Sequence, residues 1–405
     1  MEILVLIPII LIVTFILGEI FKRIGLPTVI GQILAGLIFG LPFFKEVFFD
    51  NASNLLIVEF LATLGIVLLL FLAGLEIDIN QIKENSKDSI LICLGSVTVP
   101  FIFGFLFIFL VFPQYGILTA IIFGGAMMVT SEGTKVKVLM DLNSLNTRLG
   151  AIMLSAGAID DIFEVLLLSI VVLLAKGEGT LLNVLILPIE IVIFLAIAFF
   201  CFKLMKKVLK YLDKNPSDDT ALFSVVMIFI LVLAALSEAL HIGYLVGAIL
   251  GGFLLQSSMK KIAPKNKRKM INVIKLIALG FIVPFFFVHI GISLELTSLF
   301  SNSYLIIATV IIAFSGTMIG TLIIKPFSTL TWKQLYYAGW GMNSRGAAEL
   351  VVALLALQYG LIPNEIFSAL VAMSIITTLS FAPILARGIK RNPGLMNEIQ
   401  TKEKP

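Results

Sequence analysis

Long apolar runs constrain this chain more than any other feature of its sequence. Runs of about 20 residues recur along almost the whole chain, and each is long enough to cross a bilayer as a helix. Of the 405 residues, 59% are hydrophobic and 13% are charged, whereas about 25% of the residues of a soluble domain are charged. The sequence therefore predicts an all-α polytopic membrane protein. Its net charge of +4 gives no reason to expect a nucleic-acid partner.

We expect about thirteen transmembrane helices. They fall near 1–21, 27–41, 54–75, 89–112, 116–142, 146–175, 181–206, 219–237, 239–257, 270–295, 302–325, 332–358 and 363–387. Lysine and arginine residues concentrate in alternate loops, most strongly at 203–214 and 260–269. By the positive-inside rule these loops are cytoplasmic, which places the N-terminus outside and the C-terminus in the cytoplasm. The first run lacks a basic region before it and a small-residue cleavage site, so we expect a span and not a signal peptide.

The two halves of the sequence resemble each other. "VIGQILAGL" (29–37) aligns with "LVGAILGGF" (245–253), "LGIVLLLFL" (64–72) with "LGFIVPFFF" (279–287), and "TSEG" (130–133) with "NSRG" (343–346). The matches keep their order at nearly constant offsets, which indicates a duplicated unit. Seven helices separate equivalent spans, so the two copies enter the membrane from opposite sides. Such an inverted repeat is typical of secondary transporters, which bind their substrate near the midplane.

The duplication predicts how the domain is organised. We expect one membrane domain over 1–390, followed by a short cytoplasmic tail at 391–405. Within the membrane domain, repeat one covers about 1–175 and repeat two about 219–390, each with six helices. A linker helix at about 181–206 joins the two repeats.

Polar residues interrupt three spans at the same depth. "AIDDIFEV" (158–165) places Asp160, Asp161 and Glu164 in the middle of one span, and "VTSEGTK" (129–135) and "MNSRGAAE" (342–349) interrupt two others. An unbroken helix has little reason to carry such residues, so we predict two discontinuous helices that cross beside the two aspartates. Unwound backbone is tolerated at this depth only where it lines a cavity, and its carbonyls and half-helix ends can hold ions.

The same residues predict a site for a dehydrated monovalent cation. Its oxygen ligands are expected from Asp161, Asp160, Thr130, Ser131 and freed backbone carbonyls. Burial disfavours the charged form of a carboxyl group, and a second carboxylate nearby disfavours it further. A proton and a cation therefore compete for the same oxygens, which couples their movements in opposite directions. Na⁺ and K⁺ can use the same ligands, so both remain candidates, and no cofactor is expected.

Structural roles are the alternatives for these residues. Asp160 and Asp161 would then form a polar contact between helices, and the two hydroxyl groups would satisfy backbone at a helix break. Arg345 and Glu349 are spaced i, i+4, so they either pair with each other or Arg345 offsets negative charge at the crossing. Lys135 and Lys137 point toward the cytoplasmic half, where they can simply snorkel. Supporting positions of the site are Glu132 (a ligand, a partner of Arg345 or a cavity-wall residue), Glu164, Asn343 and Ser344.

These motifs resemble those of the monovalent cation:proton antiporters of the CPA2 type. They are "LPTVIGQILAGLIFG" (26–40), "LGIVLLLFLAGLEID" (64–78), "VTSEG" (129–133), "GAIDDIFEVLLLSIV" (157–171), "IGYLVGAILGGFL" (242–254) and "NSRGAAELVVA" (343–353). The resemblance implies a homodimer in the cell membrane of a prokaryote, with a core domain that slides against a dimerisation domain. It also implies that Asp161 is the main carrier of Na⁺ or K⁺ and of the proton, with Asp160 and Thr130 completing the site.

Two features depart from parts of that group. Electrogenic sodium/proton antiporters of this type carry a lysine in the span before the second broken helix, where this sequence has Thr317 within "FSGTMIGTLIIK" (314–325). We therefore expect electroneutral exchange. Glutathione-gated potassium efflux relatives carry a cytoplasmic nucleotide-binding domain after the membrane part, and this chain ends about 20 residues after the last predicted span. We expect no nucleotide-binding domain in it.

Three other classes of protein would also carry acidic residues within a membrane. A sodium-coupled solute symporter has a similar broken-helix architecture but needs a larger cavity lined for an organic substrate. An intramembrane aspartyl protease places its aspartates on two helices, one of them in a Gly-x-Gly-Asp motif that this chain lacks. Paired acids also suit binding and competition better than the rapid conduction of a channel. The sequence thus favours a cation/proton antiporter, not an enzyme.

Overall fold

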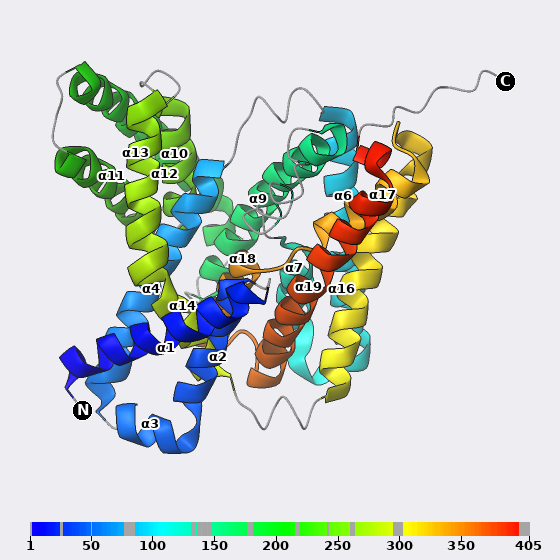
Figure 1. The fold of residues 1–405 in the computed structure, drawn as a ribbon, viewed down its shortest axis with the longest axis horizontal. Helices are drawn as coiled ribbons and strands as arrows, with labels where there is room; N and C mark the ends of the chain where they lie inside the picture. Colours follow the sequence, from blue (N-terminus) through cyan, green and yellow to red (C-terminus); the bar gives the residue numbers. More distant parts are fainter. Residues whose placement is uncertain are drawn as a thin grey trace. The chain divides into compact units, whose positions relative to one another are not determined.

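The structure is a computed structural model in which every described secondary-structure element is a helix (Figure 1). It describes residues 2–24, 27–49, 51–76, 86–130, 135, 139, 144, 147–175, 181–214, 219–240, 243–259, 264–294 and 303–396. Each predicted span contains at least one helix. The prediction of an all-α polytopic fold is therefore confirmed.

The helices of the first half follow the predicted spans closely. They are α1 (Ile3–Arg23), α2 (Thr28–Gly40), α3 (Pro42–Phe49), α4 (Ala52–Glu76), α6 (Ser86–Val111), η1 (Pro113–Tyr115), α7 (Gly116–Met128), α9 (Arg148–Ala175) and α10 (Leu181–Lys214). The sequence did not predict α3, which bends away from α2 by 83°. Pro42 begins α3, and proline cannot continue the hydrogen bonding of a preceding helix.

The second half repeats much of this order. Its helices are α11 (Asp219–Ala239), α12 (Tyr244–Ser258), α13 (Pro264–Ile277), the π-helical turn η3 (Ala278–Ile282), α14 (Val283–Ser293), α16 (Ser303–Ile323), η4 (Lys325–Phe327), α17 (Trp332–Met342), α18 (Ala347–Gln358), α19 (Asn364–Arg391) and η5 (Pro393–Met396). Within the described residues, six helices are long and apolar enough to span a membrane, or seven when α2 and α3 count as one bent span.

Helix positions support the duplication predicted from the sequence. The helices that begin at residues 3, 28, 116 and 148 have counterparts that begin at 219, 244, 332 and 364, a constant offset of 216 residues. α2 packs against α14, and α4 packs against α12. Each of these contacts joins a helix of one predicted repeat to a helix of the other. Glycine permits both close approaches. An added Cβ would lie 2.2 Å from the Val288 carbonyl oxygen at Gly36, and 2.1 Å from the Phe71 carbonyl oxygen at Gly252.

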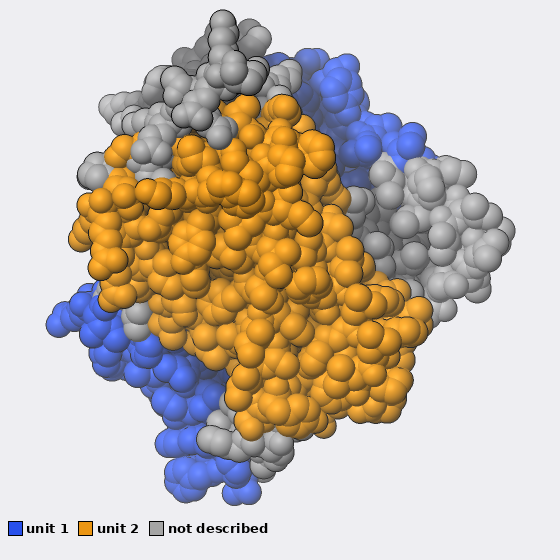
Figure 2. Space-filling view, turned by 90° about the vertical axis from the view of Figure 1, so that its right-hand side faces the viewer, with its two compact units in different colours: residues 1–77, 168–294 blue, residues 78–167, 295–405 orange. Residues whose placement is uncertain are grey.

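The chain forms two compact units, and each unit is made of two separate stretches of the chain (Figure 2). Unit 1 comprises residues 1–77 and 168–294, and unit 2 comprises residues 78–167 and 295–405. Each unit therefore takes segments from both predicted repeats. All the described candidate site residues belong to unit 2.

Unit 2 is built around the packing of α6 on α16. At their closest approach, an added Cβ on Gly95 would lie 2.1 Å from the Gly320 carbonyl oxygen, and one on Gly320 would lie 2.0 Å from the Gly95 carbonyl oxygen. Small residues at such contacts let helix backbones approach closely. α16 also packs against α17 and α19, so these helices of unit 2 form one packed group.

A polar cluster fixes the beginning of α9, the helix that carries the acidic residues. Asp88 accepts hydrogen bonds from the Ser328 hydroxyl at 2.7 Å and the Thr329 backbone N–H at 3.0 Å. Arg148, the first residue of α9, donates to the Thr329 hydroxyl at 2.8 Å and lies 3.6 Å from an Asp88 carboxylate oxygen. The starts of α6 and α9 are thus tied to the loop before α17.

Candidate cation site

The first predicted break begins where α7 ends. α7 stops at Met128, and Val129 has extended backbone angles of φ −70° and ψ 137°. Val129 and Thr130 are both buried. Ser131 and Glu132, which the sequence assigned to the site, lie outside the described residues.

The second predicted break is present between α17 and α18. α17 ends at Met342, and α18 begins at Ala347, which leaves residues 343–346 outside both helices. Asn343, Ser344 and Arg345 are fully buried in this non-helical segment. The Asn343 side chain donates to the Gly339 carbonyl oxygen at 3.0 Å, which satisfies a carbonyl at the end of α17.

Thr130 and Asp160 join the first break to α9. The Thr130 hydroxyl donates to Asp160 Oδ2 at 2.6 Å, and the Thr130 backbone N–H donates to the same oxygen at 3.1 Å. Both residues are almost fully buried, with exposures of 3% and 2%. The O–H···O distance is in the range of a hydrogen bond to a charged acceptor. The end of α7 therefore holds one carboxylate oxygen of Asp160 in a fixed position.

The other two acids of α9 are also buried. Asp161 is 8% exposed and Glu164 is 4% exposed. Glu164 lies one helical turn after Asp160, so the two share a face of α9, while Asp161 lies about 100° around the axis. Glu164 Oε1 has no hydrogen-bond partner in the described part of the chain. A buried acceptor without a hydrogen-bond partner destabilises the folded protein, because it has lost its water and gained no bond. A proton or a cation at this position would supply the missing interaction.

Arg345 connects the two breaks. Its guanidinium donates to the Val129 carbonyl oxygen at 2.5 Å and to the Thr317 hydroxyl at 3.3 Å. The Thr378 hydroxyl of α19 donates to the backbone carbonyl of Arg345 at 2.6 Å. The structure thus places Thr317, the position where the sequence lacks the expected lysine, beside a different cation.

Arg345 and Glu349 attract each other electrostatically, but they form no hydrogen bond with each other in the described part of the chain. α18 begins at Ala347, so Arg345 precedes the helix and the i, i+4 geometry does not apply. Both oxygens of the fully buried Glu349 carboxylate lack a hydrogen-bond partner among the described residues. Glu349 lies in the first turn of α18, where the positive end of the helix dipole favours a negative charge.

Lys135 and Thr378 contribute contacts that sequence reasoning missed. Lys135 is fully buried and its ammonium lies 3.4 Å from Met342 Sδ at the end of α17, so the snorkelling prediction is wrong. Its partner is 207 residues away in the chain, and no local pattern indicates it. For Thr378, two adjacent threonines within an apolar span were the available signal.

Carboxylates alone do not complete this site. Within the part of the chain that the structure describes, no group of three or more His, Cys, Asp or Glu side chains is arranged to hold a metal ion. A monovalent cation would therefore need hydroxyl and backbone oxygens beside the aspartates, as the helix break provides at Thr130. The arrangement offers buried acids, oxygen ligands and a fixed guanidinium, which suit cation binding and proton exchange.

A buried charged site between interrupted helices of an all-helical polytopic protein defines a membrane transporter. Among solved structures, the sodium proton antiporter MjNhaP1 from Methanocaldococcus jannaschii shares the fold, with a TM-score of 0.71. The alignment covers 96% of each chain at 15% sequence identity. This similarity agrees with the predicted antiporter fold.

The sequence comparisons identify the family. Residues 9–387 match the family model described as sodium/hydrogen exchanger, transmembrane. The chain is 28% identical to a Na⁺/H⁺ antiporter of Enterococcus hirae, over 96% of this chain and 98% of that protein. It is 27% identical to the Na⁺/H⁺–K⁺ antiporter GerN of Bacillus cereus, over 94% of each. The chain belongs to the sodium/hydrogen exchanger family, which is a family of transporters and not of enzymes.

Proposed function

We propose that this protein exchanges Na⁺ or K⁺ for H⁺ at Asp161 and Asp160, as an antiporter of the CPA2 type in a prokaryotic cell membrane. The observation that carries the proposal is the pair of hydrogen bonds from Thr130 to Asp160, because they join the broken helix to the acidic helix within a buried site. The similarity to antiporters that are named for Na⁺ and for K⁺ supports the same class of cargo.

The proposed roles follow from the hydrogen bonds. Asp160 has one oxygen engaged by Thr130 and serves as the oriented partner. Asp161 is the neighbouring acid that binds the cation when it is charged and the proton when the cation leaves. Thr130 contributes an oxygen ligand, and Ser131 is assigned a similar part from the sequence. Competition between the two cargoes for Asp161 couples their movements in opposite directions.

Arg345 supports an electroneutral exchange. A guanidinium stays protonated at every physiological pH, whereas a buried lysine can lose its proton. The Arg345 charge beside Thr317 is therefore constant through the transport cycle. No lysine at this position takes up or releases a proton together with the transported ions. We assign one proton moved for each cation.

The division into two units supports an elevator form of alternating access. All the described residues of the proposed site belong to unit 2, which we assign as the moving core. Unit 1 is assigned as the scaffold, through which two copies form a homodimer. The N-terminus is assigned to the outside and the C-terminus to the cytoplasm, from the distribution of basic residues.

Proton flux from reconstituted protein tests the function. Purified protein in proteoliposomes that contain a pH-sensitive dye is challenged with Na⁺, K⁺ or Li⁺. We expect a proton flux with the wild type and with Glu365→Gln, a control acid at the start of α19, but none with Asp161→Asn. Absence of flux in the wild type with all three cations refutes the function, whereas full activity of Asp161→Asn refutes only the site. Strong dependence of the rate on an imposed membrane potential refutes electroneutral exchange.

A further inference from the structure

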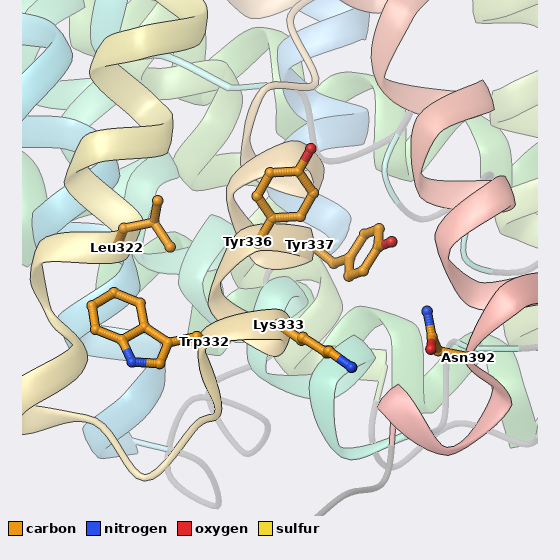
Figure 3. A pocket seen from close by; sticks show the side chains of 6 residues that line it. All are labelled: Leu322, Trp332, Lys333, Tyr336, Tyr337 and Asn392. Carbon is orange, nitrogen blue, oxygen red and sulfur yellow. The ribbon is translucent and has the colours of Figure 1, made fainter.

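A groove in unit 2 lies at the ends of α16, α17 and α19, in a region with no assigned role (Figure 3). Its volume is about 340 Å³. It is lined by Leu322, Trp332, Lys333, Tyr336, Tyr337 and Asn392. The positive-inside rule assigns this end of unit 2 to the cytoplasmic side of the membrane.

The groove is built by specific local structure. Thr331 and Gln334 form a reciprocal capping box, which fixes the start of α17 and therefore the positions of Trp332 and Lys333. Tyr337 lies directly on α19 at Gly388, where an added Cβ would be 1.9 Å from Tyr337 Cε1. The glycine thus allows the tyrosine ring to form one wall of the groove. Figure 3 shows Lys333 extending toward Asn392, and Trp332 lying beside Leu322.

The charged residues on the two segments that line the groove are all basic. Lys333 is exposed and forms no hydrogen bond or ion pair with any described residue. Arg387, Lys390 and Arg391 lie in the last turns of α19, just before the lining residue Asn392. No acidic residue occurs in 321–348 or in 366–397. These two segments contain all the lining residues, and Asp88, which contacts the loop before α17, is engaged by Ser328, Thr329 and Arg148.

An apolar stripe leads away from the groove along α16. Ile307, Ile311, Ile319 and Ile323, with Ser315 between them, form a ridge that winds around the helix, and the four isoleucines are 59%, 59%, 43% and 63% exposed. Leu322, which lines the groove, shares a helix face with Ile319. The stripe covers about 24 Å of the helix axis and turns by about 160° around it. One leaflet contributes about 15 Å of hydrocarbon, so the stripe is long enough for an acyl chain.

We infer that this groove binds an anionic phospholipid, with the phosphate group at Lys333 and an acyl chain along α16. Trp332, which is 60% exposed, and Tyr336, which is 41% exposed, fit this position. Tryptophan and tyrosine are favoured at the level of lipid headgroups. Basic pockets between transmembrane helices on the cytoplasmic side bind anionic headgroups. A soluble phosphate compound would use the cations but not the exposed apolar stripe.

Tryptophan fluorescence provides a direct test, because the chain contains only Trp332 and Trp340. In Trp340→Phe, the remaining Trp332 reports on the groove. The protein is reconstituted in mixed vesicles in which either phosphatidylglycerol or phosphatidylcholine carries brominated acyl chains that quench tryptophan. We expect Trp332 to be quenched more strongly by brominated phosphatidylglycerol at equal mole fraction. Lys333→Gln should lower this preference about fivefold, since each basic residue near an anionic surface contributes about 1 kcal/mol.

Matched variants separate a specific site from general attraction. Lys333→Arg keeps the charge and should retain the preference. Lys22→Gln, at the end of α1 in unit 1, should leave it unchanged. Equal quenching by both lipids, or an unchanged preference in Lys333→Gln, overturns the proposal. Loss of the preference on adding inorganic phosphate would assign the site to a soluble ligand, and shielding of Trp332 from both lipids would assign it to a second copy of the chain; both results overturn a lipid site.

Discussion

The contact between Thr130 and Asp160 gives the most direct test of how the broken helix serves the acidic helix. Replacing Thr130 by valine keeps the shape of the side chain but removes the hydroxyl that donates to Asp160 Oδ2 at 2.6 Å. The backbone N–H bond to the same oxygen, at 3.1 Å, remains. The substitution therefore removes one of the donors that stabilise the charged form of Asp160, without disturbing the chain path.

The size of the effect follows from the burial of the pair. A hydrogen bond to a charged group contributes about 1.5–3 kcal/mol, and both residues are at most 3% exposed, so water does not replace the hydroxyl. The loss disfavours the charged carboxylate, which the cation needs, and favours the protonated form. Every 1.4 kcal/mol changes an equilibrium constant by a factor of about ten. We expect the cation concentration for half-maximal exchange to rise on the order of 10- to 100-fold.

Cation titration of proton flux in proteoliposomes at fixed pH measures this change. Thr130→Ser keeps a hydroxyl and should stay close to the wild type. Thr309→Val is the matched control, since Thr309 is also fully buried in unit 2 but donates only to the Leu305 carbonyl of its own helix. If Thr130→Val needs no more cation than Thr309→Val, the hydroxyl does not act on the binding site and the reasoning fails.

Two further predictions concern the packing and the charge of unit 2. Gly320→Ala should destabilise the protein by about 1–3 kcal/mol, because its Cβ meets the Gly95 backbone and overpacking costs this much; thermal unfolding in detergent measures it. Gly280→Ala, where nothing lies within 4 Å of the added Cβ, serves as the control, and equal melting temperatures would contradict the packing argument. Arg345→Lys should lower the exchange rate at least tenfold, because one ammonium does not reproduce the fork that bonds Val129 and Thr317. A wild-type rate in proteoliposomes would show that only the charge matters.

Local sequence patterns predicted the helices and the break between α17 and α18. Apolar runs of membrane-spanning length located the spanning helices, though not α3, because a lipid-facing helix needs a continuous apolar surface. Polar residues and a glycine in the middle of such a run indicated the helix break from Asn343 to Gly346. These signals are carried by neighbouring residues, so a single sequence contains them in full.

Contacts between distant residues were not predictable in the same way. The helical i, i+4 geometry expected for Arg345 and Glu349 is absent, because the spacing rule assumes that both residues are helical and α18 starts two residues after Arg345. The actual partners of Arg345 lie on three other segments, at Val129, Thr317 and Thr378. Sequence spacing gives no information on which of several buried polar groups meet after folding. Sequence spacing also gives no information on the two units, because each unit combines segments of both predicted repeats that meet only after folding.

The fixed position of Arg345 bears on why Thr317 needs no lysine. A lysine at that position would bring a charge that a buried site can remove by deprotonation. Thr317 instead accepts a hydrogen bond from Arg345, whose other bond goes to the Val129 carbonyl at the end of α7. Both acceptors are neutral, so the guanidinium charge is not cancelled by a direct ion pair with either one. Under the proposed function, this permanent charge offsets one of the buried carboxylates in every state of the cycle. Within the Asp160–Asp161 pair, the other carboxylate then carries one cation or one proton, so that each exchange moves no net charge; Glu164 and Glu349 are not assigned to the transported ions.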